Sequence, residues 1–454
     1  MKAMSRKTKG TAPKEEAVRT LVPKLRFPEF RGEGAWTTET LGSLARISTE
    51  KIGDKTCIPM SITSGVGLVS QMDKFGRIIA GSSFVNYLQL KKDDFAYNKS
   101  ATKEYPEGFI ALYSGEELAA VPNSIFTCFR INGDSPAPKY LNYLFRGNLH
   151  GRWLHKFIEV GARAHGSLSI DEDDFLALPV PLPSGKTSRR EQQKIAECLS
   201  SVDEVIAAQT RKLDALKTHK KGLMQQLFPR EGETQPRLRF PEFQAAEEWK
   251  KATIQELIDK NFIVGHLDGN HGSLYPRAEE FSESGVPYIS ANCFNNGTVD
   301  FRKCKFLPVE RAKQFRKGVA RHDDILFAHN ATVGPVAKLS TDFDFVILST
   351  SLTYFRCNQR FLVSDFLRCL LTSPAFVDQY KGVMAQSTRN QIPITTQRRF
   401  SLQIPDFPEQ QRIASCLSTL DDLIAAESQK LEALKTHKRG LMQQVFPSPE
   451  EVEA

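Results

Sequence analysis

The sequence lacks the motifs of several common classes of enzyme and metal protein. It contains no CxxC pair among its 8 cysteines, no HExxH and no GxGxxG, which argues against a zinc centre and a dinucleotide fold. It contains no NPPY or DPPY, the tetrapeptides that an amino-methyltransferase needs. The GKT at 185–187 lacks the first glycine of a phosphate loop, because Val180 stands there. We therefore expect a non-catalytic chain that itself binds no cofactor or metal.

Long apolar runs are also absent, and neither sign of charge dominates. No run of about 18 apolar residues occurs, which argues against a membrane span, and without a recognisable signal peptide we expect a reducing cytoplasm. The 61 Lys and Arg residues exceed the 53 Asp and Glu, giving a net charge of +8 that allows a polyanionic partner. A length of 454 residues allows two or three domains.

What the sequence does contain is a long repeat. Residues 191–229 read EQQKIAECLSSVDEVIAAQTRKLDALKTHKKGLMQQLFP, and residues 409–447 read EQQRIASCLSTLDDLIAAESQKLEALKTHKRGLMQQVFP. About 27 of the 39 positions are identical, far more than chance composition would give. Each copy carries one cysteine, Cys198 or Cys416, which we expect to be buried as a small apolar residue.

Each copy has apolar residues spaced alternately four and three positions apart, the a/d pattern of a coiled coil. A proline ends each copy, so each predicts one helix of roughly 55 Å. Gln209 and Lys220, with their equivalents Glu427 and Lys438, are polar a/d residues, which select register and partner. We expect the helices to pair antiparallel within the chain; the alternative is two helices that each pack on their own domain. The predicted pairing residues are Ile195, Leu199, Val202, Ile206, Leu213, Leu216, Leu223, Ile413, Leu417, Leu420, Ile424, Leu431, Leu434 and Leu441.

A second repeat precedes each long helix at a distance. The motif LRFPEF occurs at 25–30 and 238–243, and a tryptophan follows each copy, Trp36 and Trp249. The sequence therefore contains the same order of segments twice: an LRFPEF motif, a variable body and a long helix. We predict an α+β protein with an internal pseudo-twofold repeat. Its predicted segments are a disordered basic tail at 1–22, domains at 23–183 and 230–408, helical spacers at 184–229 and 409–447, and a tail at 448–454.

The two variable bodies differ in sequence but show similar element patterns. Strands are predicted at 109–113 and 124–131 in the first body, and at 286–290, 324–327 and 351–355 in the second. The segment DDFAYNKS at 93–100 aligns with DDILFAHN at 323–330. A helix is then predicted at 138–157 and at 364–380. One difference is the insert PSGKTSRR at 183–190, which predicts that the first long helix begins later or meets its domain differently.

These paired helices, LRFPEF motifs and proline-bounded strands resemble the specificity subunit of type I DNA restriction–modification enzymes, over about residues 23–447. The resemblance implies two target-recognition domains, each binding one half of a split asymmetric site in double-stranded DNA. It also implies that the long helices set the gap and dock two adenine-N6 methyltransferase (M) subunits. Restriction/translocase (R) subunits would then join. S-adenosylmethionine, ATP and Mg would be used by those partners and not by this chain.

The resemblance also suggests which residues contact DNA. Polar loops near the strand ends supply them, since Arg and Asn suit purine edges while Lys and Ser mostly bind phosphates. For any one of these residues, the alternative is a solvated or turn-forming side chain. The candidates are Ser61, Ser64, Asn98, Lys99, Ser100, Lys103, Arg163, His165 and Ser167 in the first domain, and Ser290, Asn292, His329, Asn330, Thr332, Ser387, Thr388, Arg389 and Asn390 in the second.

A protein of another class would share the long helices. A coiled-coil scaffold whose globular ends bind other proteins is the alternative function. Steeply salt-dependent binding to a split DNA site would separate the two, because phosphate contacts release counterions and a scaffold makes none.

Overall fold

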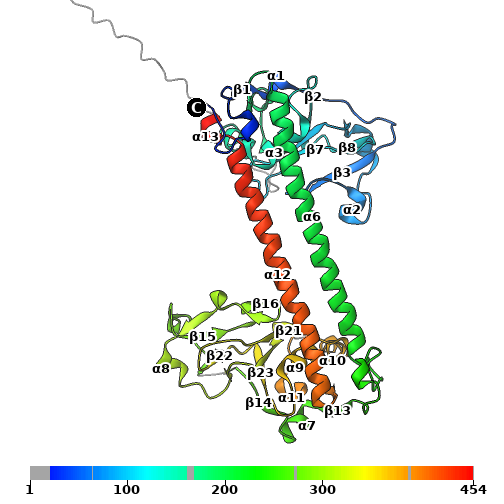
Figure 1. The fold of residues 1–454 in the computed structure, drawn as a ribbon, viewed down its shortest axis with the longest axis vertical. Helices are drawn as coiled ribbons and strands as arrows, with labels where there is room; N and C mark the ends of the chain where they lie inside the picture. The colour runs from blue at the N-terminus through cyan, green and yellow to red at the C-terminus, as the bar shows by residue number, and fades with distance from the viewer. Residues whose placement is uncertain (1–20, 64, 161–167, 270–273, 387–389, 453–454) are drawn as a thin grey trace, which may run out of the picture. The chain divides into compact units, whose positions relative to one another are not determined.

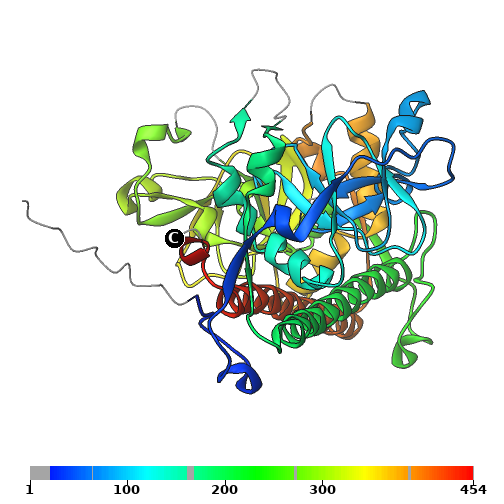
Figure 2. The ribbon, with the colours of Figure 1, turned by 90° about the horizontal axis from the view of Figure 1, so that it is seen from above.

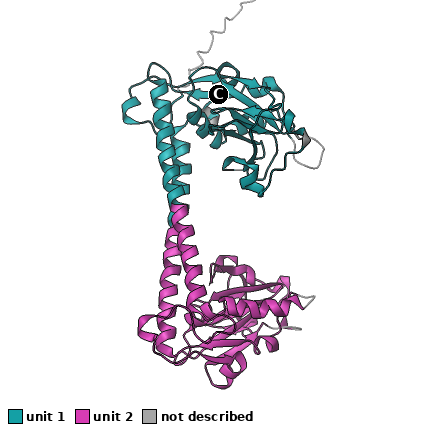
Figure 3. Cartoon of the chain, turned by 90° about the vertical axis from the view of Figure 1, so that its right-hand side faces the viewer, with its two compact units in different colours: residues 1–208, 430–454 teal, residues 209–429 magenta. Residues whose placement is uncertain are grey.

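The computed structural model describes residues 21–63, 65–160, 168–269, 274–386 and 390–452. The chain divides into two compact units, which Figure 3 colours separately. Unit 1 comprises residues 1–208 and 430–454, and unit 2 comprises residues 209–429. Both units contain helices and strands, so the prediction of a mixed α and β protein is confirmed. Of the predicted basic tail, residues 1–20 lie outside the described residues.

Unit 1 contains two four-stranded sheets, with the strand orders β2-β9-β6-β7 and β4-β3-β8-β5. Strand β3 pairs in parallel with β8, while the other pairs are antiparallel. The elements, labelled in Figure 1 where space allows, are β1 (Thr37–Thr40), α1 (Leu41–Leu44), β2 (Ala45–Ser48), β3 (Ile58–Thr63), β4 (Gly67–Ser70), α2 (Gln71–Phe75), β5 (Leu88–Leu90), β6 (Phe95–Asn98), β7 (Phe109–Leu112), β8 (Ala119–Val121), β9 (Phe126–Ile131), α3 (Pro138–Arg146), α4 (Leu149–Leu154), β10 (Glu159–Val160), β11 (Leu168–Ser169), α5 (Glu172–Leu176), β12 (Pro179–Leu182) and α13 (Pro449–Val452).

Unit 2 contains a six-stranded sheet, β14-β23-β20-β21-β17-β16, and a four-stranded sheet, β18-β15-β22-β19. Here β15 pairs in parallel with β22. The elements are β13 (Lys250–Thr253), α7 (Ile254–Asp259), β14 (Ile263–Asp268), β15 (Val286–Ile289), β16 (Phe294–Asn295), β17 (Thr298–Val299), β18 (Lys305–Leu307), α8 (Val309–Ala312), β19 (Val319–Ala320), β20 (Ile325–Asn330), β21 (Thr332–Lys338), β22 (Val346–Leu348), β23 (Leu352–Cys357), α9 (Ser364–Leu370), α10 (Pro374–Ala385), α11 (Ile394–Gln397) and β24 (Ser401–Ile404).

The strand orders of the two units correspond. The order β2-β9-β6-β7 matches β14-β23-β20-β21, and β4-β3-β8-β5 matches β18-β15-β22-β19. In both units a two-stranded ribbon joins the start of the domain to the strand before the long helix, as β1-β12 and β13-β24. Asp93 and Asp323 hold the same left-handed conformation, with φ of 69° and 67°. The alignment of 93–100 with 323–330 therefore falls on matching strands, β6 and β20.

The helices predicted at 138–157 and 364–380 are each divided in two. Asn148 interrupts the first with φ of 60°, a left-handed conformation that does not continue an α-helix. In the second, α9 ends at Leu370, and Ser373 caps α10 by accepting from Phe376 N before Pro374. The 3.6-residue periodicity continues through both breaks, so the apolar pattern alone does not reveal them.

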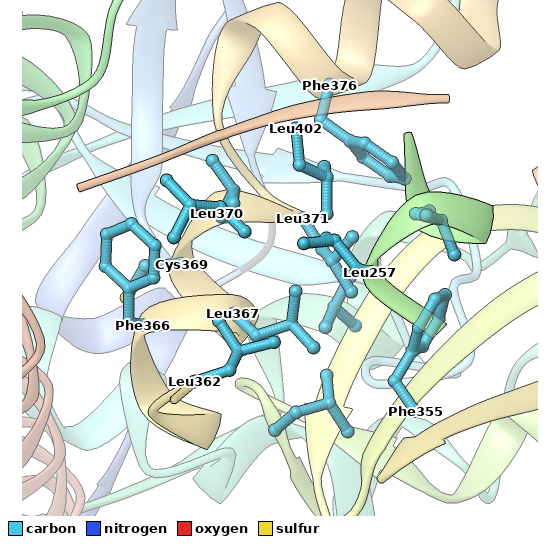
Figure 4. Packing of buried hydrophobic residues seen from close by; sticks show 14 of the residues in the cluster. Leu257, Phe355, Leu362, Phe366, Leu367, Cys369, Leu370, Leu371, Phe376 and Leu402 are labelled. Carbon is cyan, nitrogen blue, oxygen red and sulfur yellow. The ribbon is translucent and has the colours of Figure 1, made fainter. Parts of the chain in front are cut away.

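Aromatic packing builds the cores of both units. In unit 1 the rings of Phe95 and Phe129 stack with centroids 5.0 Å apart. In unit 2 the buried cluster that Figure 4 shows includes Phe355, Phe366 and Phe376, which are at most 2% exposed. Burying such rings removes large apolar areas from water and supplies most of the driving force for folding. Packing in these cores therefore holds in place the strand ends from which the polar loops extend.

The two long helices are α6 (Ser188–Leu227) and α12 (Phe407–Val445). They lie side by side in Figures 1 and 2, and the contacts agree: within unit 2, α6 Gln209 donates to the Glu427 carbonyl at 3.0 Å, and Lys220 pairs with Asp421. Residue numbers rise along α6 as they fall along α12, so the paired segments run antiparallel. Helix α6 begins three residues before Glu191, which corrects the expectation that the insert delays it.

Every predicted pairing residue is buried or half-buried, whereas most of the intervening helix positions are exposed. The helix ends also pack on their domains: Ile195 and Leu199 join the core of unit 1, and Ile413 and Leu417 join that of unit 2. Cys198 and Cys416 are only half-buried, so the prediction that they are buried is wrong. They stand one position before Leu199 and Leu417, at the edge of the apolar stripe. Among the described residues, no helix has the length and apolarity that crossing a membrane requires.

The LRFPEF motifs attach the start of each domain to the helices. Arg26 donates two hydrogen bonds of 2.8 Å to the carboxylate of Glu191, and Trp36 Nε1 donates to the same carboxylate at 3.3 Å. The Leu25 amide donates to Gln444 O of α12 at 2.8 Å. The motif thus holds the first turn of one helix and the last turns of the other.

Unit 2 repeats this arrangement with the helices exchanged. Arg239 donates to Glu409 at 2.8 and 2.7 Å, and Trp249 Nε1 donates to it at 3.4 Å. The Leu238 amide donates to Gln226 O of α6 at 3.0 Å. The recurrence of EQQ and LRFPEF in the sequence therefore has a physical cause, because their Glu and Arg residues form one buried ion pair in each unit.

His150 makes unit 1 sensitive to acid. The ring is fully buried, and Nε2 lies 3.3 Å from Gly108 O. Burial lowers the pKa of His150 to about 4, from 6.5, because it disfavours the charged ring. The unfolded chain thus binds a proton between these values while the folded unit does not, so stability is complete above pH 6.5 and falls as the pH approaches 4. We expect a loss of roughly 3 kcal/mol across that window.

The measurement is urea unfolding at pH 7.5 and at pH 4.5. His150→Gln keeps a group that can donate to Gly108 O but does not titrate, so it should reduce the difference between the two pH values by roughly 2 kcal/mol. An equal pH difference in the variant and the wild type would contradict the assignment.

Candidate nucleic-acid interface

In unit 2 the candidate residues gather at the tip of the β20–β21 hairpin. Asn330 ends β20 and Thr332 begins β21, and between them Ala331 has φ of 62°. The Ala331 amide donates to Asn390 O at 3.0 Å, and the Ile392 amide donates to His329 O at 2.8 Å. The tertiary structure therefore brings Asn390 beside the hairpin tip. Thr332 and Asn390 are exposed and Asn330 is half-buried, whereas His329 is 2% exposed.

Ser290 and Asn292 follow the end of a neighbouring strand, β15. The Ser349 amide donates to Ile289 O at 2.8 Å, and the His329 amide donates to Ser351 O at 2.9 Å, so the ends of β15, β22 and β20 share one rim. Asn292 is exposed and Ser290 half-buried. This rim presents hydroxyl and amide groups of the kind that contact phosphates and base edges.

In unit 1 Asn98 ends β6, and the candidates Lys99 and Ser100 follow it. Asn98 is only 7% exposed, and its Oδ1 accepts from the Ser100 amide at 3.1 Å. Main-chain bonds tie Lys99 to Ile125 and Leu168. The side chains of Asn98 and, in unit 2, His329 are therefore buried in this conformation, while Lys99 and Ser100 are half-buried.

A second group of candidates lies near the β3–β4 turn of unit 1. Ser61, on β3, accepts from Lys74 Nζ at 3.3 Å. The exposed Lys103 lies in the turn from Thr102 to Tyr105, and the Tyr105 hydroxyl is 3.8 Å from where a Cβ would stand on Gly65. The structure thus places the turn of Lys103 next to the β3–β4 turn.

Basic side chains surround the same region. A hollow of about 680 Å³ opens beside Gly65 and Tyr105, between α3 and the last turns of α12. Its basic lining residues are Lys24, Arg146, Lys435, Lys438 and Arg439. Glu104 is the one acidic residue among its described lining residues. This positive surface suits phosphate groups.

Seven of the candidates lie outside the described residues, and their positions are not assigned. They are Ser64, Arg163, His165, Ser167, Ser387, Thr388 and Arg389.

In each unit one aspartate of a long helix forms ion pairs that the sequence did not predict. In unit 1, Asp203 of α6 accepts from Tyr143 at 2.9 Å and pairs with Arg146 at 3.4 Å; Lys438 of α12 pairs with it at 2.5 Å. In unit 2 the repeat-equivalent Asp421 pairs with Lys220 and with Arg368. The repeat identified these aspartates and lysines as equivalent, but the two arginines occupy unrelated sequence and are brought in only by folding.

Two solved structures have a similar fold. The S subunit of a type I restriction–modification system from M. genitalium aligns with a TM-score of 0.56 and 16% identity, over 94% of this chain and all of that one. A chain from a structure concerning complex assembly and conformational transition of the type I R-M system aligns with a TM-score of 0.55 and 17% identity, over 91% of this chain and 98% of that one. At such identities the likeness concerns the fold alone.

Sequence comparisons extend the likeness beyond the fold. Residues 246–436 match the family described as type I restriction modification DNA specificity domain. The MjaVIII specificity subunit of Methanocaldococcus jannaschii is 23% identical over 63% of this chain and 65% of its own length. The MjaX subunit of the same organism, described as putative, is 25% identical over 74% of this chain and 73% of its own length. The chain is thus similar to specificity subunits of type I restriction–modification systems, and residues 246–436 match the family of their specificity domain.

Proposed function

We propose that this chain is the non-catalytic DNA-recognition subunit of a type I restriction–modification complex. The domains at 23–183 and 230–408 each bind one half of a split asymmetric site in double-stranded DNA. The helical segments at 184–229 and 409–447 set the gap between the half-sites. The observation that carries the proposal is the duplicated unit: the same strand order and the same buried Arg–Glu attachment to a helix pair occur twice in one chain.

The difference between the two domains supports an asymmetric site. Lys99 and Ser100 follow β6 and are half-buried, whereas at the matching positions of β20 His329 is buried and Asn330 is half-buried. Different donors and acceptors at matching places select different bases. A chain with identical domains would instead favour a palindromic site, as symmetric dimers do.

The near-identity of the helices supports two equivalent docking surfaces. The exposed KTH at 217–219 of α6 is identical to the exposed KTH at 435–437 of α12. Two M subunits would bind there and supply adenine-N6 methylation with S-adenosylmethionine. The R subunits would add ATP- and Mg-dependent restriction. In this scheme the chain contributes position and specificity and carries out no chemical step.

Genome-wide mapping of N6-methyladenine tests the proposal. Cells with the gene should show methylation in one split, non-palindromic motif. Deleting the gene should abolish methylation at that motif, and restoring it from a plasmid should bring it back. If methylation is unchanged by deletion while the chain co-purifies with an M subunit, the proposal is wrong in its recognition role. Co-purification with unrelated proteins alone would favour the scaffold.

A further inference from the structure

In both units one aspartate joins the two long helices to the folded domain. Asp203 of unit 1 and Asp421 of unit 2 are repeat-equivalent, and each is bound by a lysine from the facing helix and an arginine from the domain. The arginines lie on corresponding helices, α3 and α9, which follow the corresponding strands β9 and β23. An arrangement that recurs on two otherwise divergent domains points to a shared requirement.

In unit 1 the connection continues to a candidate DNA-contacting turn. Arg146 uses Nη1 for Asp203, and its Nη2 donates to Gly65 O at 3.2 Å and to Val66 O at 3.4 Å. Gly65 and Val66 lie in the β3–β4 turn described above. One guanidinium therefore bridges the helix pair and the main chain of this turn. A lysine could not do so, because its single ammonium lacks the two-branched geometry.

In unit 2 the connection runs through further ion pairs to the β20–β21 hairpin. Arg368 pairs with Asp421 at 2.8 Å and with Asp365 at 3.7 Å. Asp365 accepts from Lys338 at 2.7 Å, and Lys338 is the last residue of β21. The same lysine pairs with Asp323 at 3.1 Å, at the start of the DDILFAHN segment. Ion pairs thus connect both strands of the hairpin, β20 and β21, to the helix pair.

These ion pairs affect the orientation of the turn and the hairpin more than the folding free energy. The side chains are 13 to 44% exposed, and pairs at such exposure contribute little to folding free energy. They do, however, restrict the angle at which the turn or hairpin leaves the domain. A displacement of about 1 Å is enough to spoil a bidentate contact with a base edge, since hydrogen bonds weaken steeply away from their preferred geometry.

We propose that Arg146 and Arg368 are positioning residues for DNA recognition, each aligning the DNA-contacting loops of its own unit with the helix pair through Asp203 or Asp421. The inference rests on the proposed function. It assigns each arginine to one half-site: Arg146 acts on the half bound by unit 1, and Arg368 on the half bound by unit 2.

The test compares the methylated sites of cells that carry Arg146→Lys, Arg368→Lys or the wild-type chain. Each substitution keeps the charge and the fold, so the cognate motif should stay methylated. Sites that differ from the motif by one base in one half should become methylated about tenfold more often, as expected when roughly 1.4 kcal/mol of discrimination is lost. The two variants should affect opposite halves. Arg152→Lys is the matched surface control, since Arg152 of α4 pairs with Glu450 in an exposed position.

Four results would contradict the inference. If one variant relaxed the sequence discrimination at both half-sites, the positioning role would be overturned. The same would follow if both variants left the discrimination at both half-sites unchanged. Either result would leave the proposed function intact. Loss of all methylation by both variants, with normal protein levels, would indicate a structural role instead. If the wild-type chain itself directs no split motif, the proposed function fails and this inference fails with it.

Discussion

Glu191→Gln is expected to lower the free energy of unfolding of unit 1 by about 3–5 kcal/mol. Glu191 and Arg26 are 1% and 7% exposed, and the carboxylate accepts both guanidinium hydrogen bonds. Neutralising one partner leaves the other charge buried without compensation, which costs far more than losing an exposed pair. The substitution also weakens the bond from Trp36 Nε1.

Tryptophan fluorescence during urea unfolding measures this effect. Trp36 touches Glu191 itself, and a Trp249→Phe background removes the signal of the equivalent tryptophan in unit 2. Glu197→Gln is the control on the same helix, because Glu197 is exposed and should change stability by no more than about 0.5 kcal/mol. A loss of less than about 1 kcal/mol for Glu191→Gln would mean that the buried pair does not hold the motif.

The repeat supplies an independent check. Glu409→Gln should destabilise unit 2 by a similar amount, since Arg239 and Glu409 are 7% and 2% exposed and bind in the same way. Here a Trp36→Phe, Trp153→Phe background leaves Trp249 to report on unit 2. A large effect in one unit and none in the other would show that the two attachments are not equivalent.

Removing one heptad from each long helix is expected to replace the recognised motif with one whose gap is about three base pairs shorter. Seven residues correspond to roughly 10 Å of helix, and one base pair to about 3.4 Å of DNA. Residues 206–212 and 424–430 are the segments to delete, because they are centred on Gln209 and Glu427, which face each other. The deletion keeps the a/d spacing and leaves the helix ends that pack on the domains.

The new motif should keep both half-sites and change only the gap, as seen in genome-wide methylation. Deleting residues 206–212 alone is the control: the helices would then differ in length, their pairing would be out of register, and methylation should be lost. An unchanged gap after the double deletion would rule out the helices as the spacer. The experiment assumes the proposed function, and its outcome does not depend on which bases are recognised.

The sequence by itself determined the repeated elements of this protein. The heptads predicted α6 and α12, because a long apolar stripe at that spacing can only be buried on a helix, and their burial follows the predicted positions. The alignment of 93–100 with 323–330 found matching strands, β6 and β20, since the paired aspartates and alternating apolar residues are local signals. The strands at 109–113, 286–290 and 351–355 were placed to within about two residues for the same reason.

Only the tertiary structure decided which of these elements meet. The breaks at Asn148 and Ser373 depend on local backbone geometry and capping that apolar periodicity does not register. The burial of Asn98 and His329, both predicted at a surface, follows from packing between strands. The partners of Glu191 and Asp203 lie 165 and 57 residues away in sequence, or on the other long helix. Contacts of this kind arise from chain topology, and an isolated sequence carries no local pattern that specifies them.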